Sequence, residues 1–419
     1  MINDFTSLFQ IDFYLKVWHF MFVLWPIWLP LSLITLLFHT WFSYKRREWM
    51  REQGSVLLEI KLPKIIEKSP AAMEMVLEGI WEDVVGTLTD VYIKGRVRDW
   101  FSLEIVSIGG DVKFFIWGLK KWKNIIESRI YTHYPGAEVF EVEDYALKMF
   151  YDPTVMSMSG ITTRLNKPDA YPIKTYIDYE LDKGSKEPEE IVDPIVPMIE
   201  YLGSLKPGEL AGIQILIQGH RKEGFQDTRL FSKPDWQGGI KKEIKKIIDE
   251  ESFTKSNKSA KDKTQSPLLL TFLTKTQDDT IKAIERNAGK LAFNTMIRLV
   301  YTAPIEIFDK VKLTGMIGSM RQFGSKNLNG IRPDKFMSIE YPWKDFRDRK
   351  KRWLHRTHIE AYKRRSFFDV PYKHLNGKPY VLTVEELATL FHFPGATATT
   401  PTLIRVPSKK AEAPANLPV

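Results

Sequence analysis

The sequence contains no cysteine. The chain therefore cannot form disulfides, thiolate zinc sites or iron–sulfur clusters with its own side chains, and it has no cysteine nucleophile. A chain of 419 residues without a single thiol is typical of a reducing compartment. We expect its stability to rest on packed apolar cores.

Catalytic motifs are missing as well. The sequence has no Gly-x-Ser-x-Gly, no His-Glu-x-x-His and no dinucleotide glycine fingerprint. Residues 318–326 (GSMRQFGSK) have glycines and a lysine, but their spacing does not match a phosphate-binding loop. Ser252 and Lys255 match Ser-x-x-Lys within a lysine-rich tract, where a chance match is expected. We therefore predict a non-enzymatic protein without a cofactor or metal.

Two histidines are candidate metal ligands. His355 and His358 stand three residues apart, on one face of a predicted helix. Flanking Arg352 and Arg356 oppose a divalent cation, and the pattern offers no third ligand. We interpret the two histidines as structural or solvent-facing residues.

One long apolar run is present near the N-terminus. Residues 17–44 contain no Asp, Glu, Lys or Arg, and a helix of about 20 apolar residues spans a bilayer. Trp18, Trp41 and Tyr44 lie near its ends, where aromatic rings prefer the membrane interface. We predict one transmembrane helix over 17–44, preceded by an interfacial segment over 1–16. The alternative is a buried core helix, or a re-entrant loop broken at its prolines.

The charges that flank this run predict its orientation. The N-terminal side carries one lysine, whereas the C-terminal side begins with Lys45, Arg46 and Arg47. Basic residues favour the cytoplasmic side, so we expect the N-terminus outside and the bulk of the chain in the cytoplasm. The net charge of +9 suits contact with anionic lipids or nucleic acid.

The cytoplasmic part predicts two αβ modules in tandem. In the first module, residues 50–150, apolar runs and turn signals give the order strand, helix, strand, strand, helix, strand. That is the order of a ferredoxin-like split βαβ unit. Residues 151–335 repeat it more loosely, with strands expected at 172–177 and 267–274 and a disordered insertion near 252–265. The predicted fold class is α+β, with two tandem ferredoxin-like modules after the anchor.

A basic segment precedes an extended tail in residues 336–419. Residues 344–365 hold ten Lys or Arg against three acids, and clustered cations of this kind bind phosphates or lipid head groups. The plainer alternative, a solvated helix packed on its aromatic residues, is favoured because charge runs are usually surface. Five prolines after residue 393 predict an extended end. The candidate polyanion contacts are Arg347, Arg349, Lys350, Lys351, Arg352, Arg356, Lys363, Arg364 and Arg365.

Three stretches resemble a known family. They are 126–142 (IESRIYTHYPGAEVFEV), 193–218 (DPIVPMIEYLGSLKPGELAGIQILIQ) and 382–394 (LTVEELATLFHFP), the last followed by TPTLIRVPSKKAEAPANLP. They look like the membrane-anchored region that precedes the motor domain of bacterial type IV secretion coupling proteins, the conjugative DNA-transfer ATPases. The resemblance implies the bacterial cytoplasmic membrane and a translocation machine.

The sequence departs from that family in one respect. The threonine- and proline-marked segment leads into a P-loop motor there, but these 419 residues contain no such loop. We expect the motor on a separate chain or in a further part of a longer product. The expected partners are the lipid bilayer, that P-loop ATPase, DNA and another copy of this chain.

Three hypotheses follow. The first is a non-catalytic, membrane-anchored accessory subunit or domain that docks the ATPase. The second is a membrane-tethered nucleic-acid-binding protein that uses residues 344–365. The third is an enzyme with an unrecognised site that gathers titratable residues such as His220 and Glu209.

Overall fold

The computed structural model describes residues 2–63, 68–183, 192–224, 236–256, 274–336, 343, 345–395 and 405–406. The chain divides into two units. One, which we call the helical unit, comprises Met1–Glu52 and Gly86–Val97. The other, which we call the sheet unit, comprises Gln53–Val85 and Arg98–Val419.

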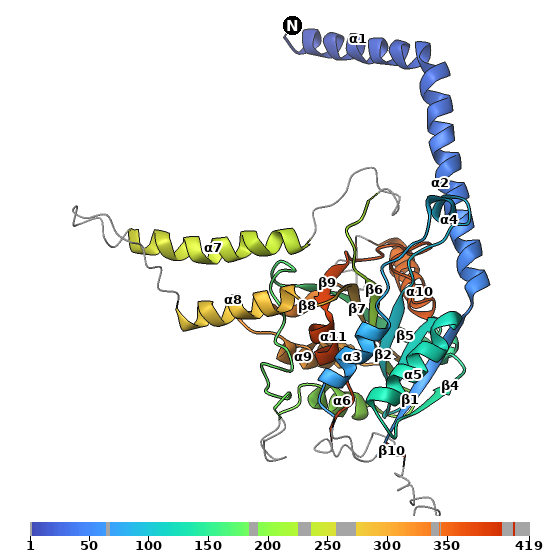
Figure 1. The fold of residues 1–419 in the computed structure, drawn as a ribbon. Coiled ribbons are helices and arrows are strands. Elements are labelled where there is room, and N and C mark those ends of the chain that lie inside the picture. The colour runs from blue at the N-terminus through green and yellow to red at the C-terminus, as the bar shows by residue number, and fades with distance from the viewer. Residues whose placement is uncertain are drawn as a thin grey trace, which may run out of the picture. The chain divides into compact units, whose positions relative to one another are not determined.

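The helical unit contains α1 (Ile2–Val23), α2 (Trp25–Gln53) and the short α4 (Leu88–Tyr92). The two long helices meet at a bend at Leu24 (Figure 1). Pro26 explains the break, because its ring lacks an N–H and disfavours helical geometry in the residue before it. Pro30 lies inside α2 without ending it.

The predicted membrane helix is therefore divided. Residues 17–44 do not form one helix, since α1 ends at Val23 and α2 begins at Trp25. Among the described residues, one helix, Trp25–Gln53, is long and apolar enough to cross a membrane. Residues 1–16 belong to α1, apart from Met1, which lies outside the described residues.

A single large sheet forms the centre of the sheet unit. Its main strand order is β10-β1-β3-β2-β6-β7-β5-β8, with β4 paired to β1 and β9 paired to β7. The described pairs are antiparallel except for β1 with β10. The strands are β1 (Ser55–Pro63), β2 (Phe101–Ile108), β3 (Asp111–Leu119), β4 (Glu138–Glu141), β5 (Met156–Leu165), β6 (Leu210–Gly219), β7 (Ala292–Pro304), β8 (Ile331–Phe336), β9 (Tyr380–Thr383) and β10 (Arg405–Val406).

The expectation of two tandem ferredoxin-like modules is wrong. Strand β2 pairs with β6 along its whole length, from Phe101 opposite Ile217 to Ile108 opposite Leu210, so the strands of both halves form one sheet. Both strands are buried over nearly all their residues, which suits strands in the middle of a covered sheet. The order β4-β1-β3-β2 in one half matches the order β8-β5-β7-β6 in the other.

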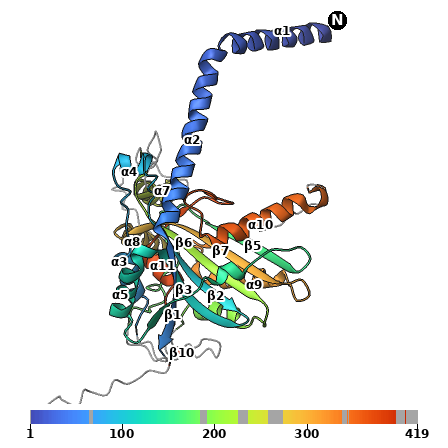
Figure 2. The same cartoon turned by 90° about the vertical axis from the view of Figure 1, so that its right-hand side faces the viewer.

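Helices cover both faces of this sheet. Phe114 and Phe115 are neighbours in β3, so their side chains point to opposite faces. Phe114 contacts Phe391, which follows α11, whereas Phe115 stacks on Tyr145 of the short helix η2 (Tyr145–Lys148). Figure 2 shows α10 (Arg349–Lys363) on the side opposite α3 (Ala71–Gly79), α5 (Lys123–His133) and α11 (Val384–Leu390). The remaining helices of the sheet unit are α6 (Val196–Gly203), α7 (Trp236–Ser256), α8 (Lys275–Ala288) and α9 (Val311–Ser319).

Residues 345–395 belong to the sheet unit. Strand β9 pairs with the start of β7, and every residue of α11 is buried. Thr383 and Glu386 form a capping box that fixes the start of α11. The expected extended end, at 396–404 and 407–419, lies outside the described residues.

The insertion also differs from the prediction. Helix α7 continues to Ser256 and so includes the first residues of the segment expected to be disordered, while 257–265 lie outside the described residues. Residues 172–177 do not form the expected strand, since 172–175 have no regular secondary structure and a turn begins at Tyr176. The strand expected at 267–274 falls almost wholly outside the described residues.

Candidate functional site

The basic segment forms α10, and its first turn is well defined. The Asp345 carboxylate accepts hydrogen bonds from the backbone N–H groups of Lys350 (2.8 Å) and Lys351 (2.7 Å). These N–H groups lack partners within a helix, so a carboxylate there stabilises the helix start. Arg347 and Asp348 precede the helix with positive φ angles of 56° and 54°.

One side of α10 packs on the sheet and the other faces solvent. The buried side carries His355, His358, Ile359, Ala361 and Tyr362. On the outer side Arg349, Lys350, Arg356 and Arg364 are exposed, and Trp353 is 59% exposed. The helix thus packs on its tyrosine and presents a basic face to solvent.

Carboxylates pair with only part of this basic face. Glu360 lies 3.7 Å from the Lys363 ammonium and 3.5 Å from the Arg364 guanidinium. Among the residues that the structure describes, no carboxylate forms an ion pair with Arg349, Lys350 or Lys351. These cations keep their charge available to an anion in solution.

Arg365 is placed differently from the other predicted polyanion contacts. It follows α10 and is completely buried. Its Nε donates to Glu104 Oε1 (2.9 Å) and its Nη2 donates to Glu104 Oε2 (3.0 Å). The same guanidinium also pairs with Asp144. Arg365 therefore does not face a ligand in solution.

A polar network surrounds this ion pair inside the sheet unit. Glu104 of β2 also accepts hydrogen bonds from Ser102 (2.7 Å), Tyr145 (2.8 Å) and the Gln214 amide (3.0 Å). The Tyr145 and Tyr362 hydroxyl oxygens lie 2.7 Å apart. Burial would raise the pKa of Glu104, but the charge and hydrogen bonds of Arg365 outweigh it and lower the pKa. The network thus stabilises a charged carboxylate in the interior, where burial of an unpaired carboxylate would cost a large amount of free energy.

Comparison with known proteins identifies a family. A family model matches residues 39–405, from α2 to β10, and so covers most of the chain. The chain belongs to DUF8128. This family is described as a domain of unknown function. A search of curated proteins found no match.

A second buried cation of this DUF8128 protein lies beside the first network. Arg298 of β7 is fully buried and donates to the carbonyl oxygens of Ala361 (3.0 Å) and Ser366 (2.5 Å). Burial lowers the pKa of Arg298 to about 9. Burial and then the charge of Arg298 lower the pKa of neighbouring His358 to about 3. His358 is therefore neutral.

A third polar cluster of the DUF8128 domain surrounds α11. Glu385 lies 3.0 Å from the Arg286 guanidinium and 3.2 Å from the Lys290 ammonium, and Lys290 also pairs with Glu74 of α3 at 2.5 Å. Glu386 accepts hydrogen bonds from four groups: the N–H of Ile173 (2.9 Å), the N–H of Thr383 (2.8 Å), the Thr383 hydroxyl (3.2 Å) and the amide of Asn287 (3.2 Å). Burial raises the pKa of Glu386 to about 7, although these bonds oppose the shift. The cluster fixes α11 to α3 and α8.

The predicted membrane-interface residues lie in the helical unit. Trp18 is exposed in α1, and Trp41, Tyr44 and Arg47 are exposed in α2. Lys45 pairs with Glu48 at 2.6 Å and lies 5.4 Å from the Trp41 ring centroid. Arg46 is buried, with its guanidinium 4.1 Å from the Phe42 ring centroid.

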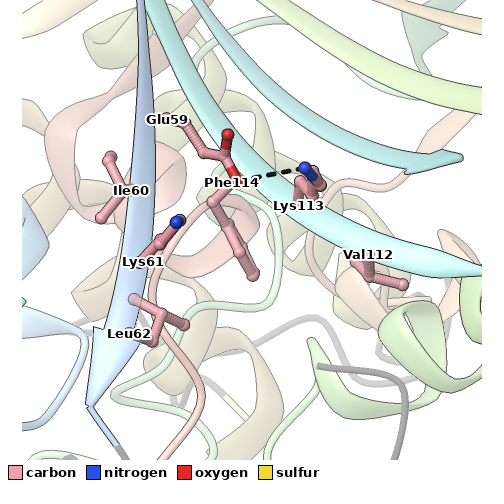
Figure 3. Close-up of a pocket in the computed structure, with 7 residues that line it drawn as sticks. All are labelled: Glu59, Ile60, Lys61, Leu62, Val112, Lys113 and Phe114. Atoms are coloured by element: carbon pink, nitrogen blue, oxygen red, sulfur yellow. Dashed lines mark ion pairs between the residues drawn. The ribbon is translucent and has the colours of Figure 1, made fainter. Parts of the chain in front are cut away.

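A small pocket lies between β1 and β3 (Figure 3). The two strands pair from Ser55–Leu119 to Ile60–Phe114, and the pocket lies at the end of the ladder formed by this last pair. Its volume is about 160 Å³. Its single carboxylate, Glu59, forms a 3.2 Å ion pair with Lys113. The other lining residues are Lys61, Leu62 and Val112.

The residues considered for an enzyme site do not come together. Glu209 precedes β6 and His220 follows it, so ten strand residues separate them. Glu209 is bonded to the Tyr301 hydroxyl (2.7 Å), and His220 Nδ1 lies 2.7 Å from Asn294 Oδ1. The described part of the chain shows no group of three or more His, Asp or Glu residues able to hold a metal ion.

The sequence patterns did not identify Glu104, Arg298 or Glu386 as members of polar clusters. A charged residue in the middle of an apolar strand is the signal that marks the first two, in FSLEIVSI and in NTMIRLVYT. Glu386 lies in the segment 382–394, but its burial depends on neighbours that are distant in sequence.

Proposed function

We propose that this DUF8128 protein is a membrane-anchored, non-catalytic subunit or domain of a translocation machine of the type IV secretion kind. In this proposal α2 spans the bacterial cytoplasmic membrane, the N-terminus lies outside, and the sheet unit lies in the cytoplasm. The basic residues that follow the apolar part of α2 support this orientation. The sheet unit docks a cytoplasmic P-loop ATPase.

The observation that carries the proposal is the position of residues 382–394. This segment, which resembles the one preceding the motor in coupling proteins, forms β9 and α11 in the core. The ion pairs of Glu385 and the hydrogen bonds of Glu386 hold α11 in place. Residues 382–395 therefore hold a fixed place in the sheet unit, ahead of β10, which pairs with β1. A motor that binds beside this segment would be attached to a rigid part of the protein.

The test uses the full chain in lipid nanodiscs and the P-loop ATPase encoded nearest its gene. We expect the two to co-elute, and we expect the chain to change the ATP hydrolysis rate of the ATPase. A variant that ends after Val406 keeps β10 and separates the contribution of the last residues from that of the sheet unit. ATP hydrolysis by the chain alone, or no association with the ATPase, contradicts the proposal.

The exposed basic face of α10 supports a second candidate function, which is polyanion binding. Lys and Arg that neutralise phosphates release counterions, so affinity falls with salt, with a slope of about 0.9 per phosphate contact. Exposed Trp353 adds a ring on which a base can stack. This function is compatible with the first, since a machine that moves DNA needs surfaces that contact it.

The salt dependence of binding to duplex DNA tests this candidate. The triple variant Arg349→Ala, Lys350→Ala, Arg356→Ala should weaken binding and reduce the slope of log affinity against log salt by about 2 to 3. The matched control replaces three exposed lysines of α7, Lys241, Lys242 and Lys245, by alanine. Equal effects of the two triple variants would show that only net charge matters and would reject a site on α10.

A further inference from the structure

Helix α4 lies against the end of α2 that follows its apolar stretch. The Tyr92 ring centroid is 5.6 Å from that of Phe42. Gly95, with a φ of +73°, comes so close to α2 that a Cβ atom there would lie 2.5 Å from the carbonyl carbon of Lys45. Only glycine fits both the backbone angle and the close approach. Figure 1 shows α4 beside α2.

The depth of this contact follows from the length of the span. Phe42 is 17 residues after Trp25, which at 1.5 Å per residue is about 26 Å along the helix. A hydrocarbon core is roughly 30 Å thick. If α2 spans the membrane from Trp25, Phe42 and Lys45 lie where hydrocarbon gives way to head groups. The segment that touches them lies at the same depth.

The surface of α4 suits that depth. Leu88 is 47% exposed and Ile93 is 63% exposed, although Val91 between them is fully buried. Lys94 and Arg96 follow directly, and the one acid of the segment, Asp90, is paired with Lys94 at 2.8 Å. Exposed apolar side chains beside basic ones are the composition that lies in an anionic membrane interface.

The conformation of α4 is fixed locally. Thr87 and Asp90 form a capping box, in which the Thr87 hydroxyl accepts from the N–H of Asp90 and the Asp90 carboxylate accepts from the N–H of Thr87. Hydrogen bonds from Lys94 and Thr87 hold the pKa of Asp90 below its ordinary value. The segment therefore presents Leu88 and Ile93 without first having to fold on a lipid surface.

We infer that residues 86–97 form a second membrane contact, in which Leu88 and Ile93 enter the interface of an anionic bilayer beside the α2 span. This inference rests on the proposed membrane anchor. It adds to the anchor because a single helix leaves rotation about its axis free, whereas a second contact at its side restricts that rotation.

The absence of cysteine makes a direct test available. Single-cysteine variants Leu33→Cys, Leu88→Cys and Ile93→Cys of the full chain are labelled with an environment-sensitive fluorophore and reconstituted in phosphatidylcholine vesicles with phosphatidylglycerol. We expect lipids brominated near the end of the acyl chain to quench the label at Leu33. Lipids brominated near the head group should quench the labels at Leu88 and Ile93. The latter two should also show a blue-shifted emission.

The outcomes separate the two proposals. Iodide in the aqueous phase quenches only labels that are exposed to water. If lipid bromines quench the label at Leu33 but only iodide quenches the labels at Leu88 and Ile93, the anchor is supported and the inference about α4 is wrong. No lipid quenching at Leu33 overturns the anchor itself. As a matched pair, Leu88→Asp should reduce lipid quenching of the label at Ile93, whereas Leu147→Asp, at an exposed leucine of the sheet unit, should not.

Discussion

Arg365 and Glu104 form a completely buried, bidentate ion pair, with nitrogen–oxygen distances of 2.9 Å and 3.0 Å. They are 261 residues apart in the sequence. The pair connects the end of α10 to the centre of the sheet.

Removing one partner of this pair should strongly destabilise the protein. Arg365→Leu leaves the Glu104 charge buried without its cation, and such changes cost about 3 to 5 kcal/mol in the free energy of unfolding. Urea unfolding of the detergent-solubilised chain, followed by tryptophan fluorescence, measures the loss. The double variant Arg365→Leu, Glu104→Gln should lose less than the sum of the single losses.

The exposed pair of Lys282 and Asp278, at 2.6 Å, is the control for that measurement. Its removal by Lys282→Leu should cost far less than the loss of the Arg365 pair, because solvent screens both charges. An equal loss at the two sites would show that burial does not set the strength of the Arg365 pair.

Glu386 should make stability depend on pH. Its pKa in the folded state is about 7, above the ordinary value of 4.5, so the folded protein binds this proton more tightly than the unfolded chain. The resulting stabilisation is complete below about pH 4.5 and is lost as the pH rises through about 7, by about 3 kcal/mol. Glu386→Gln keeps the capping box, and comparing unfolding of the variant and the parent from pH 5 to 8 isolates the effect. A parallel pH dependence in the two proteins contradicts the prediction.

Gly212 should not tolerate a side chain. A Cβ atom on this residue of β6 would overlap the Tyr362 hydroxyl, so Gly212→Ala must displace α10 from the sheet. We expect a loss of about 1 to 3 kcal/mol in thermal or urea unfolding. Gly318, in α9, has no atom within 4 Å of an added Cβ, so Gly318→Ala should be neutral or stabilising. The prediction fails if both alanines have the same effect.

Arginine in the middle of α2 should prevent stable membrane insertion. Leu33 and Leu36 are both exposed in the helix, and each arginine at the centre of a span costs about 2.5 to 3.5 kcal/mol. The double variant Leu33→Arg, Leu36→Arg should lose its resistance to carbonate extraction from membranes. Leu147→Arg with Val155→Arg, at exposed apolar positions of the sheet unit, adds the same charge and should leave it unchanged.

Local patterns in the first half predict its elements well. The first strand and the strand pair in the order predicted for residues 50–150 are β1 and the β2–β3 hairpin, which the apolar residues 56–62 and the glycines of the turn at 109–110 mark. Alternation, turn residues and helix starts are local signals, and they agree there with the tertiary contacts. In the second half, residues 172–177 do not form the strand expected there, because 172–175 have no regular secondary structure and a turn begins at Tyr176.

Contacts between distant residues explain what the sequence did not predict. The pairing of β2 with β6 joins the two halves, and neither strand carries a local mark of its partner. The same holds for Arg365. In the sequence it is one of several cations in a basic run, and only its contact with Glu104 in the folded protein distinguishes it. The basic face of α10 was predictable from charge alone, but the division of its residues between core and solvent depended on the sheet beneath it.

The seam between β2 and β6 has a mechanical consequence. Because eight successive residue pairs join these strands, from Phe101–Ile217 to Ile108–Leu210, the two halves of the sheet have no hinge between them. A pull applied at β8 would reach β4 through continuous ladders of backbone hydrogen bonds. Such a sheet transmits force from one edge to the other and does not bend between its two halves.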